Sequence, residues 1–372
     1  MTPSTGDVVT VDGIIAPEEL GRTMTHEHVF IDLSNWYTDP GSAYRRAQAE
    51  NPVTMENLSE LRRNPMASKD NLLLGSMEEA VDEVGMFRDV GGDTIVEVTP
   101  KGPPGQDPEQ LRLVSRRTGV QLIQGTAYYV RTAHPDGLDE RSEQSIEDEF
   151  VSDVRDGIDE TDVQAGIIGE IGLSTDADSE IYDTELTVLK AAARAAVRTG
   201  ASLSIHPPGR KKVAQRGRTY PTSRWSLEVL DIVEEQGLPA DRVVMGHMDR
   251  TLYEDIDYLK QLAERGPYLE FDLFGSEFYY DHWDDGYPAD EWRIETIAEL
   301  VDEGHLSQIL LSHDVCQKIQ RVNYGGFGYA HVIDNVVPMF EQLGGLDGDQ
   351  IQTMLVDNPR EMLTFAEPEE AV

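Results

Sequence analysis

With 372 residues, the chain is long enough for two average domains or for one large α/β barrel, so length alone does not fix the number of domains. Its 70 acidic residues outnumber its 31 basic residues and give a formal net charge of −39, which argues against binding to nucleic acid or to an anionic membrane surface. No apolar run approaches the roughly 20 residues of a membrane span.

Composition also suggests the salt conditions and the cellular compartment of the protein. Only seven of the 31 basic residues are lysines, and the acidic residues are spread along the whole chain, as is typical of proteins from salt-loving organisms. We therefore expect a halophilic protein whose folded state needs molar salt. The single cysteine, Cys316, excludes an internal disulfide, and the N-terminal sequence lacks the basic and apolar regions of a signal peptide, so we expect a cytoplasmic protein.

The first elements of the chain suggest half of a metal site. Residues 1–20 predict a small β-hairpin laid over one end of a domain. Residues 23–29 alternate as a strand does, so His26 and His28 project from one face and Glu27 from the other. Two imidazoles on one face can bind a metal, although two hydrogen-bonded core histidines would show the same pattern.

A long polar excursion, residues 35–76, follows this strand. Its middle part, 54–63, has helical spacing with Thr54 as the candidate N-cap. Excursions of this length inside a domain are usually functional, and we expect this one to act as a lid.

The apolar pattern then alternates regularly between helix and strand. Further strands are predicted at 94–99, 121–129, 165–171, 201–206, 242–247, 268–273 and 308–314. Helices are predicted at 77–89, 108–118, 145–157, 183–199, 223–236, 252–265, 291–302 and 348–363. Eight βα units favour a closed (β/α)8 TIM barrel, with residues 1–372 as a single domain, over an open doubly wound sheet. No glycine-rich dinucleotide motif follows the first strand, which agrees with this preference.

Polar residues interrupt the apolar strands near their carboxyl ends, where such barrels place their catalytic groups. These residues are His26, His28, Glu170, His206, His247 and Asp314. Taken singly, each is as well explained by a core histidine or a solvated strand end. Together, four imidazoles and two carboxylates fit two divalent transition ions, with Glu170 as the anionic bridge between them.

Several motifs, in this order and spacing, resemble the phosphotriesterase family of the amidohydrolase superfamily, and most closely the phosphotriesterase-related proteins. They are Thr-His-Glu-His at 25–28, Ala-Gly-Ile-Ile-Gly-Glu-Ile-Gly at 165–172, Ile-His-Pro at 205–207, Gly-His-Met-Asp-Arg-Thr at 246–251, Tyr-Leu-Glu-Phe-Asp-Leu-Phe-Gly at 268–275 and Asn-Tyr-Gly-Gly-Phe-Gly-Tyr-Ala-His at 323–331. The resemblance covers nearly the whole chain and implies a metal-dependent hydrolase.

The resemblance also implies roles for single residues. His26, His28 and Asp314 would hold the more buried metal, His206 and His247 the more exposed one, and Glu170 would bridge them. Some relatives bridge with a carboxylated lysine, but no lysine occurs between Lys101 and Lys190 here.

The implied cofactors are two divalent metal ions per chain, zinc foremost, with manganese, cobalt and iron as alternatives. In the implied mechanism a bridging hydroxide attacks a carbonyl or phosphoryl centre, and Asp314 passes the proton to the leaving group. Tyr129 matches a position where some relatives place a tyrosine over the metals, which suggests substrate contact or a packing role.

One basic segment in this acidic chain suggests the kind of substrate. Residues 210–218 carry five of the 31 basic residues directly after the His206 strand. Arg210, Lys211 and Lys212 are therefore candidates to bind a substrate anion, unless this is a solvated loop. We expect cleavage of an ester, lactone or amide bond in a small anionic molecule.

Other interpretations stay open. They are an aryldialkylphosphatase-like phosphotriester hydrolase, a mononuclear deaminase-like member of the superfamily, and a binding module without metals. The oligomeric state is also open, with a homodimer as one alternative because relatives are often dimers.

Overall fold

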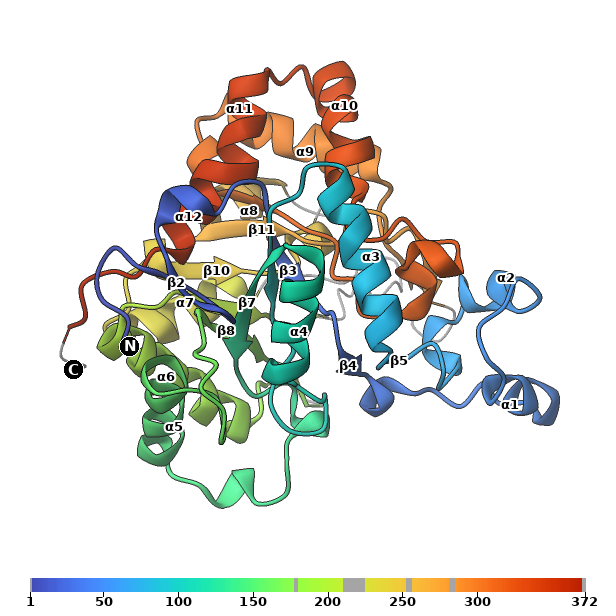
Figure 1. Cartoon of the computed structure of the whole chain (residues 1–372), viewed down its shortest axis with the longest axis horizontal. Coiled ribbons are helices and arrows are strands. Elements are labelled where there is room, and N and C mark those ends of the chain that lie inside the picture. The colour runs from blue at the N-terminus through green and yellow to red at the C-terminus, as the bar shows by residue number, and fades with distance from the viewer. Residues whose placement is uncertain (1, 177–179, 210–224, 252–255, 281–284, 370–372) are drawn as a thin grey trace.

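Eight parallel strands form a nearly closed barrel in the computed structural model, which describes all residues except 1, 177–179, 210–224, 252–255, 281–284 and 370–372 (Figure 1). Hydrogen-bonded neighbours follow the order β14-β11-β10-β9-β8-β7-β6-β3. The strands are β3 (Thr23–Glu27), β6 (Thr94–Glu97), β7 (Gln121–Thr126), β8 (Ile167–Gly172), β9 (Leu203–His206), β10 (Val243–Met245), β11 (Tyr268–Phe271) and β14 (Ile309–Leu311). The first and last strands meet where the amide of Asp314 donates to the carbonyl of His26 at 3.2 Å. The TIM barrel predicted from the sequence is confirmed.

Helices pack around this barrel (Figure 1). They are α3 (Met77–Asp89), α4 (Pro108–Thr118), α5 (Glu143–Arg155), α6 (Asp183–Thr199), α7 (Ser226–Glu235), α8 (Ile256–Ala263), α9 (Asp290–Asp302), α10 (Val337–Met339), α11 (Gly348–Gln352) and α12 (Asn358–Leu363). No described helix combines the length and the apolar character needed to cross a membrane. The ranges predicted for α3, α4 and α6 match their observed bounds, whereas the predicted C-terminal helix is divided by a π-helical segment, Thr353–Asp357.

Local chemistry explains why α4 begins and ends where it does. The side chain of Asp107 accepts a hydrogen bond from the amide of Gln110, and Pro108 occupies the first helical position. Gly119 ends the helix in the left-handed conformation at φ 72°. These signals are readable in the sequence, so the helix boundaries could be predicted.

The N-terminal hairpin closes one end of the barrel. Strands β1 (Val8–Thr10) and β2 (Gly13–Ile15) pair antiparallel. Val8 belongs to an apolar cluster that fills the barrel interior together with Leu310 and Met362. The amide of Val11 donates to the carbonyl of Leu122, which fixes the hairpin to β7. The opposite end of the barrel is left for the carboxyl ends of the strands.

The excursion at residues 35–76 differs in detail from the prediction. It contains α1 (Ala43–Ala49), the short α2 (Leu58–Leu61) and β5 (Leu73–Leu74), which pairs antiparallel with β4 (Ile31–Asp32). α2 begins later than predicted, after Asn57. Thr54 caps the turn that precedes it: its carbonyl accepts the amides of Asn57 and Leu58, and its hydroxyl accepts the amide of Glu56 at 3.3 Å. Figure 1 shows α1 and α2 projecting from the side of the barrel. The role of the excursion as a lid stays a prediction.

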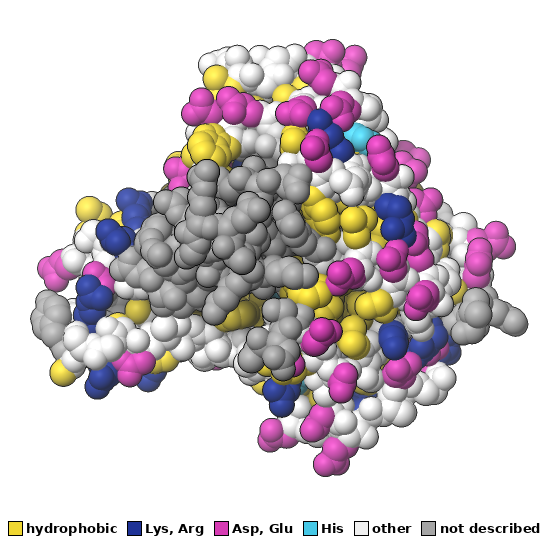
Figure 2. All heavy atoms as spheres, turned by 180° about the vertical axis from the view of Figure 1, so that it is seen from behind, with side chains coloured by type: hydrophobic (Ala, Val, Ile, Leu, Met, Phe, Trp, Pro, Cys, Tyr) yellow, Lys and Arg dark blue, Asp and Glu magenta, His cyan; other side chains and the backbone are white. Residues whose placement is uncertain are grey.

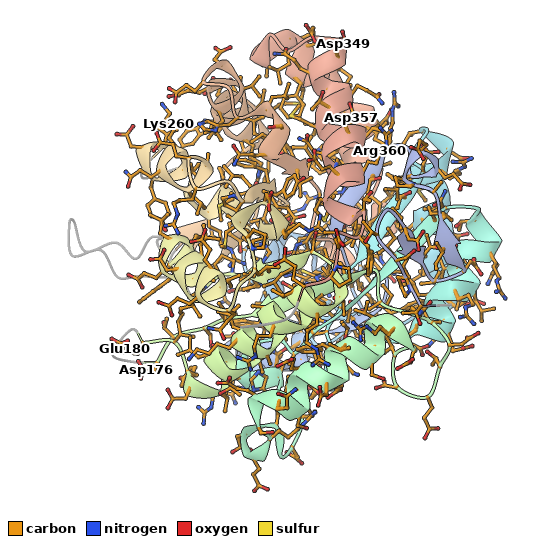
Figure 3. All side chains as sticks on the ribbon, turned by 90° about the vertical axis from the view of Figure 1, so that its left-hand side faces the viewer. Asp176, Glu180, Lys260, Asp349, Asp357 and Arg360 are labelled. Atoms are coloured by element: carbon orange, nitrogen blue, oxygen red, sulfur yellow. The ribbon has the colours of Figure 1, made fainter. Side chains whose placement is uncertain are left out.

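Acidic side chains are dispersed over the described surface. Figure 2 shows Asp and Glu scattered across one face of the molecule, with fewer Lys and Arg between them. In Figure 3, Asp349, Asp357 and Arg360 lie along the C-terminal helical segment, where Arg360 pairs with Asp357 at 3.0 Å. Lys260, also labelled there, contacts two glutamates at 2.7 Å. Lys260 can therefore balance only one of the two glutamate charges that it contacts.

Candidate metal centre

Glu170 lies among four imidazoles at the carboxyl end of the barrel. Its Oε2 is 3.0 Å from Nδ1 of His206, 3.6 Å from Nε2 of His26 and 3.9 Å from Nε2 of His247. Its Oε1 is 3.4 Å from Nε2 of His28. One carboxylate therefore reaches every candidate histidine, as a bridging ligand must.

The remaining candidates fall into two groups around this carboxylate. Oδ1 of Asp314 lies 3.2 Å from Nε2 of His28, and together with His26 they form a cluster whose ligand atoms lie within 4.8 Å of one another. On the other side, Nε2 of His247 lies 2.7 Å from Nδ1 of His206. All six side chains predicted to be metal ligands thus converge at one place.

The hydrogen bonding and the charges of this site favour a bound cation. Nε2 of His26 is buried and has no hydrogen-bond partner among the described residues, which is costly unless another group occupies its lone pair. Burial disfavours the protonated ring, yet Asp272 and Glu270 raise the pKa of His26 well above its ordinary value. For His28, burial is likewise outweighed by neighbouring carboxylates, which raise its pKa to about 10. Protons on two imidazoles would neutralise these carboxylates, and divalent cations would do so more fully.

His206 and His247 lie in an environment that favours the form able to bind metal. Burial lowers the pKa of His206, and it lowers the pKa of His247 well below its ordinary value. Burial opposes ionisation of Glu170, but hydrogen bonds with His206 and His28 hold its pKa well below the usual range. Neutral imidazoles and an ionised carboxylate are the ligand forms that divalent metals require.

A second set of side chains orients three of the histidines, and the sequence analysis assigned it no role. Nδ1 of His26 donates to Glu270 at 2.9 Å, and Nδ1 of His247 donates to Asp272 at 2.8 Å. Nδ1 of His28 lies 2.8 Å from the hydroxyl of Thr99. Each contact leaves Nε2 free to point at the centre. The sequence contained a signal for Glu270 and Asp272, because two carboxylates two residues apart in an apolar strand share one face.

One expectation about strand ends needs correction. His247 and Asp314 lie beyond β10 and β14 and not within them, because their backbones take the left-handed conformation, with φ of 57° and 49°. That conformation costs about 1–3 kcal/mol for residues other than glycine. Asp272 holds His247 in place by accepting its amide at 2.9 Å. His28 lies one residue beyond β3, yet Nε2 of His26 and Nε2 of His28 both face Glu170, so the two side chains project to one side as expected.

A cavity of about 290 Å³ opens beside these side chains. Tyr129 lines it, with its hydroxyl 3.4 Å from Nδ1 of His206. Trp36 and Met66 bring the 35–76 excursion to the cavity wall. Arg210, Lys211 and Lys212 lie outside the described residues, so their contact with substrate stays a prediction. Arg250, which the sequence analysis did not single out, does line the cavity.

Comparison with known proteins agrees with this arrangement. The model of the phosphotriesterase family matches residues 6–363. A relative from Dictyostelium discoideum named N-acetyltaurine hydrolase is 36% identical, over 98% of this chain and 100% of that protein.

Two solved structures are similar along nearly their whole lengths. A resiniferatoxin-binding protein from Rhodobacter sphaeroides is 38% identical with a TM-score of 0.90, over 100% of this chain and 99% of that one. A lactonase from Listeria monocytogenes is 25% identical with a TM-score of 0.73, over 96% and 99%. These matches confirm the resemblance seen in the sequence motifs: the chain belongs to the phosphotriesterase family of metal-dependent hydrolases.

Proposed function

We propose that the chain holds two divalent metal ions and hydrolyses the acyl bond of a small anionic amide, an N-acyl amino sulfonate or N-acyl amino carboxylate. The observation that carries this proposal is the position of Glu170 among four imidazoles, beside the unpartnered Nε2 of His26. The similarity to a protein named N-acetyltaurine hydrolase supports an amide substrate with an acid group.

The side chains divide naturally between the two ions. His26, His28 and Asp314 would hold the more buried ion, His206 and His247 the more exposed one, and Glu170 would serve both. When bound, the two ions supply Lewis acidity that polarises a carbonyl and activates water for attack. Zinc suits this mixture of imidazole and carboxylate ligands.

Asp314 and Tyr129 take the remaining roles in this proposal. The side chain of Asp314 is 14% exposed, so its carboxylate can reach the cavity, accept a proton and return it to the leaving amine. Burial raises the pKa of Tyr129 well above its ordinary value, and the nearby Glu170 and Asp314 charges raise it further. Tyr129 therefore stays protonated and can donate a hydrogen bond to the substrate carbonyl.

The fold and the metals alone do not select the bond, because an ester or lactone carbonyl would meet the same groups. A cavity of about 290 Å³ suits a compound with a short acyl group. We further propose a cytoplasmic, halophilic enzyme, and the homodimer stays an open alternative.

The test is a substrate screen in about 2 M KCl. Purified protein is incubated with N-acetyltaurine, an N-acetyl amino carboxylate, a γ-lactone and a neutral phosphotriester, and products are followed by nuclear magnetic resonance. Glu170→Gln serves as the inactive control. We expect the anionic amides to be cleaved fastest. Preference for the phosphotriester would instead support the aryldialkylphosphatase-like alternative, and one metal per chain would support the deaminase-like alternative.

A further inference from the structure

Arg250 brings a positive charge to the cavity. It lies on the short helix Met248–Thr251, directly after His247. Among the described residues that line the cavity, no other is an arginine or a lysine. Within the described part of the chain, its guanidinium forms no ion pair with a carboxylate, although the protein has 70 acidic residues. A half-buried arginine in so acidic a protein is usually paired, so the lack of a described carboxylate partner needs an explanation.

His206, the described neighbour of the Arg250 guanidinium, offers it no hydrogen-bond acceptor if His206 binds metal through Nδ1. Nη1 of Arg250 lies 3.4 Å from Nε2 of His206, while Nδ1 of that ring faces Glu170 at 3.0 Å. If Nδ1 directs its lone pair to the metal centre, the ring hydrogen must be on Nε2. Two N–H donors then lie side by side at the cavity wall, and neither can accept from the other. Both need a shared acceptor that carries negative charge.

We propose that Arg250 and Nε2 of His206 form the subsite that binds the sulfonate or carboxylate of the substrate. This inference rests on the proposed function and adds the residues that select for an anion. A sulfonate or carboxylate presents two oxygens, one for each donor. One imidazole ring separates the subsite from Glu170, so the anion and the scissile bond would be joined by a short linker.

The surroundings favour this one position for an anion. Elsewhere the cavity wall carries apolar side chains such as Leu173 and Leu273, neutral polar side chains such as Ser174 and Gln317, and the carboxylates of Glu170 and Asp314. Gly209 also borders the subsite, since a Cβ added there would lie 3.1 Å from Nη1 of Arg250. Gly209→Ala would therefore crowd the guanidinium without removing its charge.

The experiment compares matched substrates. kcat/KM is measured for N-acetyltaurine and for its neutral sulfonamide analogue, in the parent, Arg250→Met, Arg250→Lys and Gly209→Ala, at low salt and in about 2 M KCl. Arg265→Met, an exposed arginine that pairs with Asp231, is the control variant. We expect the anionic-to-neutral ratio to fall at least about 100-fold in Arg250→Met and about tenfold in Arg250→Lys, mainly through KM. Gly209→Ala should lower the ratio by less, and the control should leave it unchanged.

A second readout does not require turnover. Binding of methanesulfonate to metal-loaded protein is measured by calorimetry, and its Kd should rise at least about tenfold in Arg250→Met while metal content stays constant. If the parent cleaves neither substrate, the proposed function fails, and this titration still decides the subsite.

Three results would overturn the subsite. The first is an equal loss for both substrates in the Arg250 variants, and the second is unchanged methanesulfonate binding. The third is an effect confined to low salt, which would indicate long-range steering and not contact. Arg250→Lys and Gly209→Ala, which keep the positive charge, decide the question if Arg250→Met fails to fold.

Discussion

Glu27 closes the barrel behind the metal centre, and its removal should cost both stability and metal affinity. The side chain is fully buried on β3, between His26 and His28. Its Oε1 accepts the hydroxyl of Ser312 at 2.8 Å and both the amide and Nδ1 of His313, at 2.9 and 2.6 Å. One carboxylate thus joins the first strand to the segment that carries Asp314.

The size of the effect follows from these contacts. Oε2 of Glu27 also accepts the amide of Val315 at 3.0 Å. Glu27→Ala would leave three buried donor hydrogens without this acceptor, those of the His313 amide, His313 Nδ1 and the Val315 amide, because the Ser312 hydroxyl can still donate to the carbonyl of His26 at 2.8 Å. A buried donor left without its acceptor costs about 1–3 kcal/mol, so with three such donors we expect Glu27→Ala to lower the free energy of unfolding by about 3–5 kcal/mol. Glu27→Gln keeps one acceptor oxygen but turns an amide donor toward the amide of Val315. For this variant we expect a loss of about 1–3 kcal/mol in the free energy of unfolding.

Urea denaturation of metal-free protein at constant KCl measures these losses. Glu56→Gln, at an exposed position, should stay within about 0.5 kcal/mol of the parent and serves as the control. Metal affinity, measured by competition with a chelator, should fall about 10–100-fold in the Glu27 variants, because Asp314 loses its support. The reasoning is refuted if Glu27→Ala unfolds at the same urea concentration as Glu56→Gln.

Three further predictions concern catalysis, pH and salt. Asp314→Asn should lower kcat more than it raises KM, because proton acceptance matters most in the transition state, and steady-state kinetics with equal kcat in both proteins would remove Asp314 from the mechanism. Burial opposes ionisation of Asp290, but His331 and Arg293 lower its pKa, so its contribution to stability is complete above the ordinary value of 3.8 and is lost as pH falls through the lower folded value. The stability gap between the parent and Asp290→Asn, measured by denaturation of metal-free protein, should therefore shrink below pH 3.8, and a gap independent of pH would contradict this. The net charge of −39 predicts that the temperature at the midpoint of thermal unfolding is higher in about 2 M KCl than in about 0.1 M KCl. A midpoint temperature that falls or stays constant would argue against a halophilic protein.

Much of the fold could be predicted because its signals are local. The bounds of α3, α4 and α6 follow from apolar periodicity and from caps such as Asp107 and Gly119. The convergence of the six candidate ligands could also be predicted, since the carboxyl ends of all strands in a parallel barrel meet at one end.

The supporting interactions could not be predicted, because they depend on which strands become neighbours. Asp272 orients His247 only because β11 lies beside β10, and Glu27 meets His313 only because the last strand returns to the first. Arg250 reaches the cavity through a short turn after His247 that has no periodic signal. Thr54 caps a turn and not α2, and no sequence signal showed that the helix begins only after Asn57.

The central claim is a pair of metal ions that share Glu170. Elemental analysis of the purified parent, Glu170→Gln and Glu56→Gln, each dialysed against zinc in about 2 M KCl and checked for folding by circular dichroism, tests it most directly. We expect two metal ions per chain in the parent and in Glu56→Gln, and one or fewer in folded Glu170→Gln, because an amide cannot supply negative charge between two cations. Two ions retained in Glu170→Gln, or none in the parent, would contradict the claim.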